Sequence, residues 1–189
     1  MALRVLGIPG SLRKGSYNRA LLRAAIELAP PGMTIEIFEG IGALPLYDAD
    51  VEAAGDPPAV VAWKNAIAAA DALLIATPEY NYGVPGALKN AVDWASRPPG
   101  NCVLNRKPAA LMGGSPGSTG TARAQHALRQ SFVFTDTRTM LQPELLVPRI
   151  HEKVDAEGRV TDERTRKSVR ALLDAFADWV PRVAAPGPA

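Results

Sequence analysis

The sequence predicts an α/β fold in which one open parallel sheet is covered by helices on both faces. Apolar runs typical of buried strands alternate five times with segments whose apolar residues recur at helical spacing. The length of 189 residues fits one domain, and the 47% hydrophobic and 21% charged residues are ordinary for a folded soluble chain. This composition excludes wholesale disorder.

The first third of the chain predicts a strand, a helix and a second strand. Residues 4–8 are mostly apolar, which is typical of a strand buried on both faces. Residues 18–29 place apolar side chains at helical spacing until Pro30-Pro31-Gly32 ends the helix. The run 34–38 predicts the second strand, and we expect irregular chain from there to residue 50.

A third buried strand, residues 72–76, lies between two helices that begin at prolines. Pro57-Pro58 opens the first of these helices and Pro85-Gly86 opens the second. Their predicted inward stripes are Val60, Trp63, Ile67 and Ala70 in the first helix, and Leu88, Ala91, Val92 and Ala95 in the second. Trp94 stands outside this stripe, and we expect that it could face a partner.

The last part of the chain predicts a fourth strand over residues 109–112, a helix over 121–134 and a final helix that begins at Thr161-Asp162-Glu163. Two segments, 139–141 and 145–147, are candidates for the fifth strand and are separated by Pro143. The final helix carries an apolar stripe of Val169, Leu172, Leu173, Phe176 and Val180. We therefore expect one domain over residues 1–183 and a flexible C-terminal tail over residues 184–189.

Charge and cysteine content exclude several classes of function. The 21 Lys and Arg residues nearly balance 19 Asp and Glu residues, so no dedicated nucleic-acid binder is expected. Cys102 is the single cysteine, which excludes an intrachain disulfide and a multi-cysteine metal site and favours a reducing compartment. His126 and His151 are isolated, so we expect no metal site. No targeting or membrane-spanning segment is found, and the protein is predicted to be cytoplasmic.

The first loop with unusual composition, residues 10–18, joins the first strand to the first helix. The positive end of a helix with its free N–H groups suits an anion. Ser11, Ser16 and Asn18 add neutral donors, and Arg13 adds a charged one. The loop lacks the Lys-Ser/Thr pair of nucleoside-triphosphate loops, so the expected anion is a terminal phosphate. The alternative is that these residues only cap the helix.

The second and third unusual loops follow the third and fourth strands. Residues 77–86 contain two prolines, two glycines and the tyrosines Tyr80 and Tyr82, which suits a planar heteroaromatic ligand. The alternative is a tight turn whose tyrosines pack on a neighbouring subunit.

Residues 113–120 are rich in Gly and Ser, and their free amides could bind a carbonyl edge, whereas the alternative is a flexible surface loop. Together the three loops favour one ligand with a phosphate and a planar ring, and flavin mononucleotide (FMN) has that shape.

Three motifs resemble the NADPH-dependent FMN reductase family, and within it the bacterial chromate and quinone reductases. They are Gly10-Ser-Leu-Arg-Lys-Gly-Ser16, Pro45-Leu-Tyr-Asp-Ala-Asp-Val51, and Thr77-Pro-Glu-Tyr-Asn-Tyr-Gly-Val-Pro-Gly86 followed by Leu88-Lys-Asn-Ala-Val-Asp-Trp94. The likeness spans residues 3–180. It implies a flavodoxin-like three-layer sandwich with a five-stranded parallel sheet.

The resemblance also implies which residues hold the cofactor. The family's phosphate loop falls on Ser11, Arg13, Ser16, Tyr17 and Asn18, its flavin-ring loop falls on Pro78, Glu79, Tyr80, Asn81 and Tyr82, and its third loop contributes Ser115 and Gly117. No side chain is assigned as a catalytic acid or base, because the cofactor carries the chemistry. The third loop departs from the expected pattern in its extra proline and hydroxyls, which leaves the acceptor preference open.

The function implied by the resemblance is that of an FMN-dependent oxidoreductase with NADPH or NADH as hydride donor. Its acceptors would be quinones, chromate, azo compounds or free flavin, reduced in a ping-pong sequence, and it would form a homodimer or homotetramer with flavin sites near the subunit interface. One alternative is a flavodoxin-like electron carrier that binds FMN without oxidising NAD(P)H, although the net charge of +2 argues against an acidic docking face. A phosphate-binding domain without a redox role is the other alternative.

Overall fold

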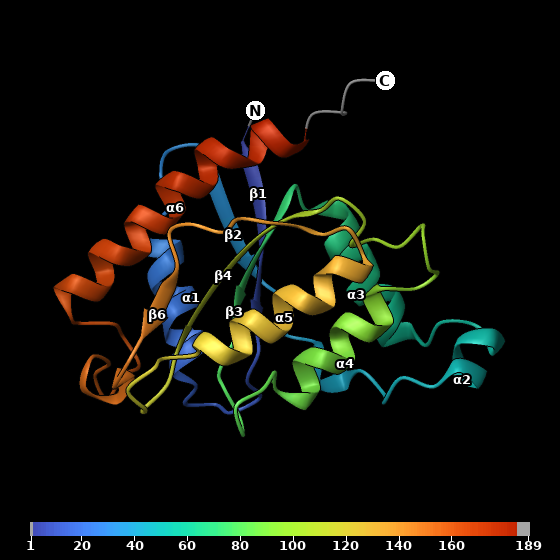
Figure 1. Ribbon diagram of the computed structural model, residues 1–189, viewed down its shortest axis with the longest axis horizontal. Coiled ribbons are helices and arrows are strands. Elements are labelled where there is room, and N and C mark those ends of the chain that lie inside the picture. Colours follow the sequence, from blue (N-terminus) through green and yellow to red (C-terminus); the bar gives the residue numbers. More distant parts are fainter. Residues whose placement is uncertain (1, 185–189) are drawn as a thin grey trace.

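The computed structural model describes residues 2–184, which form a three-layer α/β sandwich (Figure 1). The strands are β1 (Leu3–Pro9), β2 (Met33–Ile37), β3 (Ala72–Ala76), β4 (Pro108–Gly114), β5 (Arg138–Thr139) and β6 (Leu145–Val147). The helices are α1 (Tyr17–Glu27), α2 (Ala49–Ala54), α3 (Pro58–Ala69), α4 (Gly86–Ala95), α5 (Ala122–Phe134) and α6 (Glu163–Ala184), with short 3-10 turns η1 (Ile41–Ala43) and η2 (Ile150–Glu152). The predicted fold class is confirmed.

The sheet is parallel, with the strand order β2-β1-β3-β4-β5 and with β6 also paired to β4. The chain leaves β1 for β2 on one side and returns to β3 on the other. The order of the strands therefore switches direction between β1 and β3. In sheets of this kind, ligands bind beyond the carboxyl ends of the strands at this switch.

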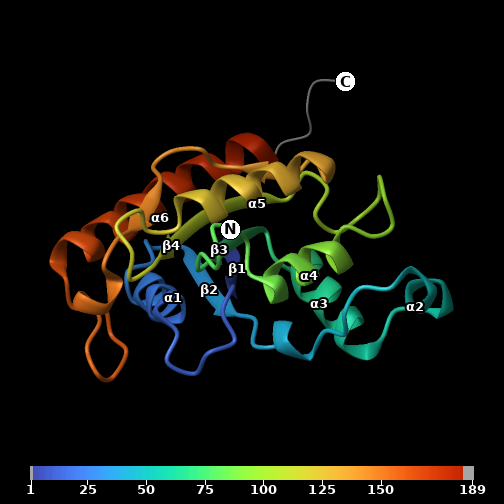
Figure 2. The same ribbon diagram turned by 60° about the horizontal axis from the view of Figure 1, so that its bottom comes forward.

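Alternate residues of the central strands point into two separate cores. Leu73 and Ile75 of β3 pack with α3, α4 and α5, whereas Leu74 and Ala76 pack with α1 and α6. Figures 1 and 2 show α1 beside α6 on one side of the sheet and α3 beside α4 on the other. Because both faces are covered, the central strands β3 and β4 are apolar without alternation, whereas the edge strand β2 alternates buried and exposed residues.

The fifth strand is interrupted. β5 pairs with the start of β4 at Pro108 and Ala109, and β6 pairs with its end over residues 112–114. The second candidate, residues 145–147, is a strand at its predicted bounds, whereas only Thr139 of the first candidate, residues 139–141, belongs to a strand. Both strands occupy one lateral position of the sheet, so the prediction of five positions is correct. Pro143 lies between them and has no N–H group to donate to a ladder, which favours a break there.

The segment between β2 and α3 differs from the prediction of irregular chain. It contains η1 and the six-residue helix α2, in which no residue is buried and which projects from the body (Figures 1 and 2). The carboxylate of Asp48 caps α2 by accepting the N–H of Asp50 at 2.8 Å. A helix this short has too few turns to show an apolar period, so the sequence pattern missed it.

Trp94 is fully buried, so the expectation that it could face a partner is wrong. Its indole N–H donates to the carbonyl oxygen of Pro45 at 2.8 Å, and the side-chain amide of Asn90 donates to the same oxygen. Asn90 in turn accepts the N–H of Tyr47 at 2.8 Å. These contacts fix the start of the projecting segment against α4.

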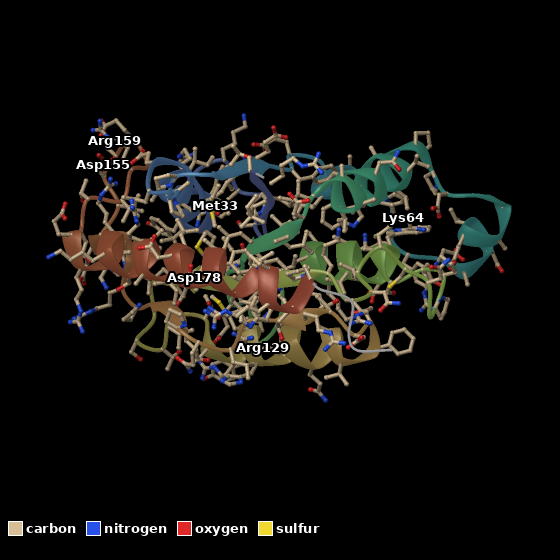
Figure 3. All side chains as sticks on the ribbon, turned by 90° about the horizontal axis from the view of Figure 1, so that it is seen from above. Met33, Lys64, Arg129, Asp155, Arg159 and Asp178 are labelled. Carbon is tan, nitrogen blue, oxygen red and sulfur yellow. The ribbon has the colours of Figure 1, made fainter. Side chains whose placement is uncertain are left out.

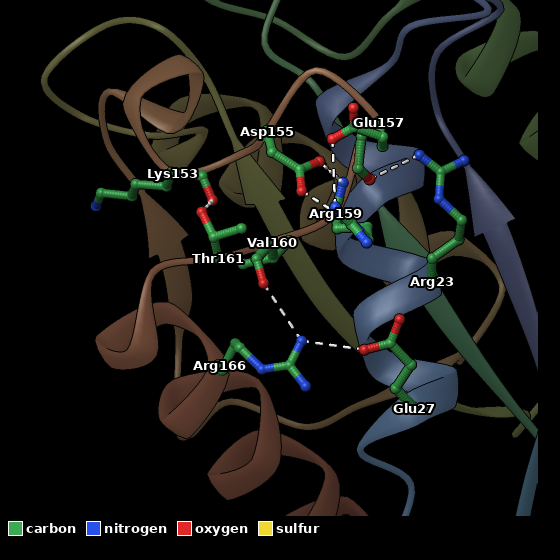
Figure 4. Close-up of polar contacts among 10 residues, drawn as sticks. Arg23, Glu27, Lys153, Asp155, Glu157, Arg159, Val160, Thr161 and Arg166 are labelled. Carbon is green, nitrogen blue, oxygen red and sulfur yellow. Dashed lines mark hydrogen bonds and ion pairs between the residues drawn. The ribbon is translucent and has the colours of Figure 1, made fainter.

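A turn between η2 and α6 is held against α1 by arginines (Figure 4). Arg23 of α1 donates to the carbonyl oxygen of Gly158 at 2.9 Å, and Arg166 of α6 donates to the carboxylate of Glu27 at 3.0 Å. Within the turn, the backbone N–H of Arg159 donates to Asp155 and lowers the pKa of that carboxyl. Figure 3 places this turn at the opposite end of the molecule from Lys64 on α3.

The long helix α6 follows the predicted pattern, and all five residues of its apolar stripe are buried. Ala184 of the predicted tail is the last residue of α6, and the rest of that tail lies outside the described residues. No helix within residues 2–184 is both long enough and apolar enough to cross a membrane.

Asp162 caps the N-terminus of α6, and loss of its carboxylate should destabilise the fold. Its carboxylate accepts the hydroxyl and the N–H of Thr165, and these bonds lower its pKa. We expect Asp162→Ala to reduce the free energy of unfolding at pH 7 by about 1 kcal/mol in urea titrations. Since the folded-state pKa is depressed, this contribution is complete above the unfolded pKa of about 3.9 and is lost as the pH falls through the lower folded value.

The matched control for this cap is Asp178→Ala, which removes an exposed carboxylate from the other end of the same helix. Asp178 lies more than one turn before the last residue of α6 and alanine forms helix better than aspartate, so this change should leave the stability unchanged or raise it slightly. Equal losses of stability in both variants at pH 7, or a loss in Asp162→Ala that persists at pH 2, would contradict the capping role.

Candidate functional site

The three unusual loops meet at the carboxyl edge of the sheet. The N–H of Gly10 donates to the carbonyl oxygen of Ala76 at 2.8 Å, and the N–H of Thr77 donates to that of Met112 at 2.9 Å. A Cβ atom on Gly113 would lie only 2.2 Å from the carbonyl oxygen of Thr77, so glycine is required for this approach. These contacts therefore hold the carboxyl ends of β1, β3 and β4 side by side.

A small hollow of about 60 Å³ lies between the first loop and the start of the second. Its lining residues come from all three loops and are Ser11, Arg13, Ser16, Tyr17, Asn18, Pro78, Glu79, Tyr80, Gly114, Ser115 and Pro116. Nine of the twelve site residues expected from the sequence line this hollow.

A larger, more open hollow of about 530 Å³ adjoins the small one. It is lined by Glu79, Asn81, Tyr82, Ser115, Pro116, Gly117, Ser118, Thr119 and Arg123. The two hollows share Glu79, Ser115 and Pro116, so they form one continuous depression. Asn81, Tyr82 and Gly117 complete the set, and all twelve expected residues thus line this depression.

The small hollow lies at the N-terminus of α1, where backbone donors are available. The hydroxyl oxygen of Ser16 accepts the N–H of Arg19 at 3.3 Å, so this side chain caps α1. The N–H groups of Tyr17 and Asn18, in the first turn, have no partner within the helix. Together with the exposed guanidinium of Arg13, they offer positive charge and hydrogen bonds to an anion.

Asn18 is buried and uses both of its polar side-chain atoms within the protein. Its amide NH₂ donates to the carbonyl oxygen of Gly114 at 3.0 Å, and its carbonyl oxygen accepts the N–H of Gly114 at 2.9 Å. This reciprocal pair joins α1 to the end of β4. The side chain of Asn18 therefore supports the wall of the hollow, and its backbone N–H and the second N–H of its amide are left as donors to an anion.

A hydroxyl pair joins the first loop to the second. The Ser11 hydroxyl lies 3.1 Å from that of Tyr80 and also accepts the N–H of Arg13 at 3.3 Å. The Tyr80 ring is thus held beside the small hollow by its oxygen. This contact within one subunit leaves the ring about half exposed, at 48%.

The second loop turns back sharply at its tip. The N–H of Tyr80 donates to the carbonyl oxygen of Gly83 at 3.2 Å and the N–H of Gly83 returns a bond of 3.0 Å. The two residues between them, Asn81 and Tyr82, have φ angles of 50° and 65°. This is the type I′ pattern, which a bulky side chain such as that of Tyr82 adopts only at a cost of roughly 1–2 kcal/mol. Backbone strain of this kind is typical of functional sites.

Glu79 lines both hollows, and its carboxylate is bonded to the start of α5. Its carboxylate accepts the N–H groups of Arg123 at 3.0 Å and Ala124 at 3.2 Å, and the Nε–H of Arg123 at 2.7 Å. Its side chain is only 6% exposed. Thr121 precedes α5 without a side-chain capping bond, so the cap of this helix comes from the second loop, across a long stretch of sequence.

Arg123 lines the large hollow but was not predicted as a cofactor-binding residue, although Ala122-Arg123 fits the family resemblance. Its guanidinium lies 3.8 Å from the centroid of the Tyr82 ring and donates to the hydroxyl of Thr119 at 2.9 Å. One face of the Tyr82 ring is therefore covered by this side chain. The available signal was the position of Arg123 in the first turn of the helix that directly follows the third loop.

The third loop is anchored at several points. Its Ser115 hydroxyl donates to the carbonyl oxygen of Gly120 at 2.5 Å, and its backbone is bonded to Val147 and Ile150 at 3.1 Å each. The N–H of Arg149 donates to the carbonyl oxygen of Gly117 at 3.1 Å. β6 and η2 thus hold the loop in place, which does not fit the alternative of a flexible surface loop.

Metal-ligating residues do not gather in the described part of the chain. Within residues 2–184, no group of three or more His, Cys, Asp or Glu side chains is placed to hold a metal ion. His126 and His151 each lie near a glutamate, at 3.9 Å and 3.8 Å, on the surface. Cys102 is buried.

Comparison with known proteins connects this geometry to one family. Residues 3–152 match the family described as NADPH-dependent FMN reductase. An NAD(P)H-dependent FMN reductase of Pseudomonas aeruginosa is 51% identical over 181 residues, which cover 96% of this chain and 97% of the relative. A 2-hydroxy-1,4-benzoquinone reductase of a Burkholderia species is 45% identical, with 95% and 97% covered.

A solved structure agrees with these matches. It is FerB of Paracoccus denitrificans, described as a flavoenzyme NAD(P)H:(acceptor) oxidoreductase. It superposes on this chain with a TM-score of 0.85 at 40% identity, and the match covers 95% of this chain and 98% of FerB.

Removal of the Glu79 carboxylate should destabilise the fold as well as the site. In Glu79→Ala, the N–H groups of Arg123 and Ala124 at the start of α5 lose their acceptor, and we expect the free energy of unfolding to fall by about 1–3 kcal/mol. Glu79→Gln keeps one acceptor oxygen and should lose less. Urea titration followed by far-UV circular dichroism measures both. Full stability of Glu79→Ala would show that Glu79 does not cap α5.

Proposed function

The chain belongs to the NADPH-dependent FMN reductase family, and on this basis we propose that it is an FMN-dependent NAD(P)H oxidoreductase that reduces quinones. The observation that carries the proposal is the continuous depression at the carboxyl edge of the sheet, in which the small and the large hollow adjoin. It lies at the switch in strand order, where this class of fold binds ligands.

The residues of the depression fit FMN. The small hollow offers the first-turn N–H groups of α1 and the Arg13 guanidinium, which are suited to a phosphate. The large hollow, at about 530 Å³, is within the range of small-molecule sites and is bordered by the backbone of the turn at Asn81 and Tyr82. A ligand with a phosphate at one end and a flat polar ring at the other matches this order of groups.

In this proposal, Ser11, Arg13, Ser16, Tyr17 and Asn18 form the phosphate end, either directly or by supporting its wall. Pro78, Glu79, Tyr80, Asn81 and Tyr82, with Ser115 and Gly117, form the ring end. Bound FMN would supply hydride acceptance from NADPH or NADH and electron donation to an acceptor. The protein's part is to bind, orient and shield, and no side chain of the depression is assigned as a general acid or base.

The finer features of the reaction belong to the same proposal. Quinones are favoured as acceptors because the Burkholderia relative carries a benzoquinone in its name, and the family resemblance adds chromate, azo compounds and free flavin. The nicotinamide and the acceptor would then occupy in turn the part of this one open hollow that the flavin ring leaves accessible. This implies ping-pong kinetics, with parallel lines in double-reciprocal plots.

We also propose that the enzyme acts in the cytoplasm as a homodimer or homotetramer. The single, buried Cys102 is consistent with a reducing compartment. Large apolar residues are exposed at the end of α5, with Val133 at 80% and Phe134 at 67%, and after β5, with Leu141 at 66%. Exposed apolar side chains of this size are typical of surfaces that pack against another chain.

The first test is the visible spectrum of the purified protein after addition of FMN and desalting. We expect retained bands near roughly 370 and 450 nm, followed by steady oxidation of NADPH with a benzoquinone as acceptor. Light scattering on the same preparation measures the assembly state. A colourless protein would contradict the proposal, and a coloured protein that leaves NADPH unoxidised would favour an electron carrier.

Arg13 should be a main anchor of the phosphate. Because loss of a charged hydrogen bond costs about 1.5–3 kcal/mol, Arg13→Ala should weaken FMN binding by roughly 10- to 150-fold. Quenching of flavin fluorescence on titration gives the dissociation constant. The matched control is Lys14→Ala, because Lys14 is the adjacent cation but does not line the small hollow. Equal affinity of Arg13→Ala and the unaltered protein would disprove this role.

A further inference from the structure

A chain of contacts crosses the outer wall of the large hollow from the second loop to the third. Glu79 holds the guanidinium of Arg123 through its carboxylate, Arg123 lies on the ring of Tyr82, and the same guanidinium donates to the hydroxyl of Thr119. We call these four residues the clasp. Three of them come from the two loops that border the hollow, and Arg123 comes from the helix behind them.

The turn of the second loop needs such support. Tyr82 has a left-handed backbone with φ of 65° and its side chain is 71% exposed, so few packing contacts hold it there. The guanidinium of Arg123 at 3.8 Å is the charged group stacked on this ring. A cation over an aromatic face is attracted by the negative face of the ring, and this attraction opposes the strain of the turn.

The third loop supplies the other end of the clasp through Thr119. The hydroxyls of this loop were the feature that departs from the expected family pattern, and the structure gives two of them a use. Ser115 donates to the carbonyl oxygen of Gly120 within the loop, and Thr119 accepts from Arg123. The Thr119 hydroxyl thus sets the distance between the third loop and Arg123.

We propose that Arg123 is a positioning residue, and that the clasp holds the second and third loops at the spacing which a planar ring requires. The inference rests on the proposed function, because it takes the ring of FMN as the occupant of the large hollow. Arg123 acts through Tyr82 and Thr119, and Glu79 holds its guanidinium in place.

The location of the clasp makes its effect separable from that of the phosphate contacts. Tyr82, Thr119 and Arg123 line the large hollow and are absent from the lining of the small one. Arg13 lines the small hollow alone. Loss of the clasp should therefore weaken binding of the ring, whether or not a phosphate is attached to it.

The experiment compares FMN with riboflavin, which has the same ring and no phosphate. Thr119→Val removes the hydroxyl with little change in shape, and Thr119→Ser restores it. Arg123→Lys keeps the positive charge but loses the planar guanidinium, which stacks on the Tyr82 ring and donates to Thr119 at the same time. We expect Thr119→Val and Arg123→Lys to weaken both ligands by the same factor, about three- to tenfold, and Thr119→Ser to bind as the unaltered protein does. Quenching of flavin fluorescence measures all eight dissociation constants.

The control is Arg13→Ala, which should weaken FMN alone and leave riboflavin binding unchanged. The ratio of the two dissociation constants therefore separates a ring effect from a phosphate effect, which an activity assay could not do. Melting temperatures of the ligand-free proteins accompany the titrations. Thr119 lies on an exposed loop, so Thr119→Val should melt within about 2 °C of the unaltered protein.

Each outcome bears on one of the two proposals. Unchanged riboflavin affinity in both Thr119→Val and Arg123→Lys would overturn the clasp while leaving the proposed function intact. A loss confined to FMN would also overturn it, because the effect would then be on the phosphate. Failure of the unaltered protein to bind either flavin would overturn the proposed function, and the clasp with it.

Discussion

The site depends on how the chain satisfies the backbone groups that become unpaired where parallel strands end and helices begin. Buried N–H and C=O groups at such ends need partners, and at this edge many of them come from other loops. The side chain of Asn18 bonds both the N–H and the C=O group of Gly114, and the carboxylate of Glu79 accepts N–H groups in the first turn of α5. Because each partner is distant in the sequence, satisfying the backbone also fixes the three loops relative to one another.

The polar residues of the site are therefore of two kinds, those that bond the protein's own backbone and those that remain exposed. Asn18 and Glu79 face inward and use their side chains on the protein itself, whereas Arg13 is exposed beside the small hollow. Buried polar groups without partners are costly, so the inward pair contributes rigidity that an exposed residue cannot. Preorganisation of this kind reduces the ordering cost of binding. The inward residues can therefore matter to a ligand that their side chains do not touch.

Much of the fold could be predicted because a strand that is buried on both faces is a short continuous run of apolar residues in the sequence. The strands β3 and β6 were predicted at their observed bounds, whereas the two-residue strand β5 shares only Thr139 with the predicted segment 139–141. The helix α2 was missed because a helix of six residues, none of them buried, carries no apolar period. The loops that form the depression were predicted from composition and resemblance, but the partners of Glu79 and Asn18 were not. Glu79 and Arg123 are 44 positions apart, and no local pattern reports a contact at that separation.

The third loop shows why a departure from a family pattern needs the three-dimensional context before it is assigned to specificity. Taken alone, its extra hydroxyls suggest new contacts with an acceptor. In the structure, Ser115 donates to Gly120 and Thr119 accepts from Arg123, so both hydroxyls are used to hold the wall of the hollow. A wall with a fixed spacing favours flat ligands over bulky ones without a dedicated contact to any of them. Selectivity for a class of planar acceptors can therefore arise from the rigidity of the loops themselves.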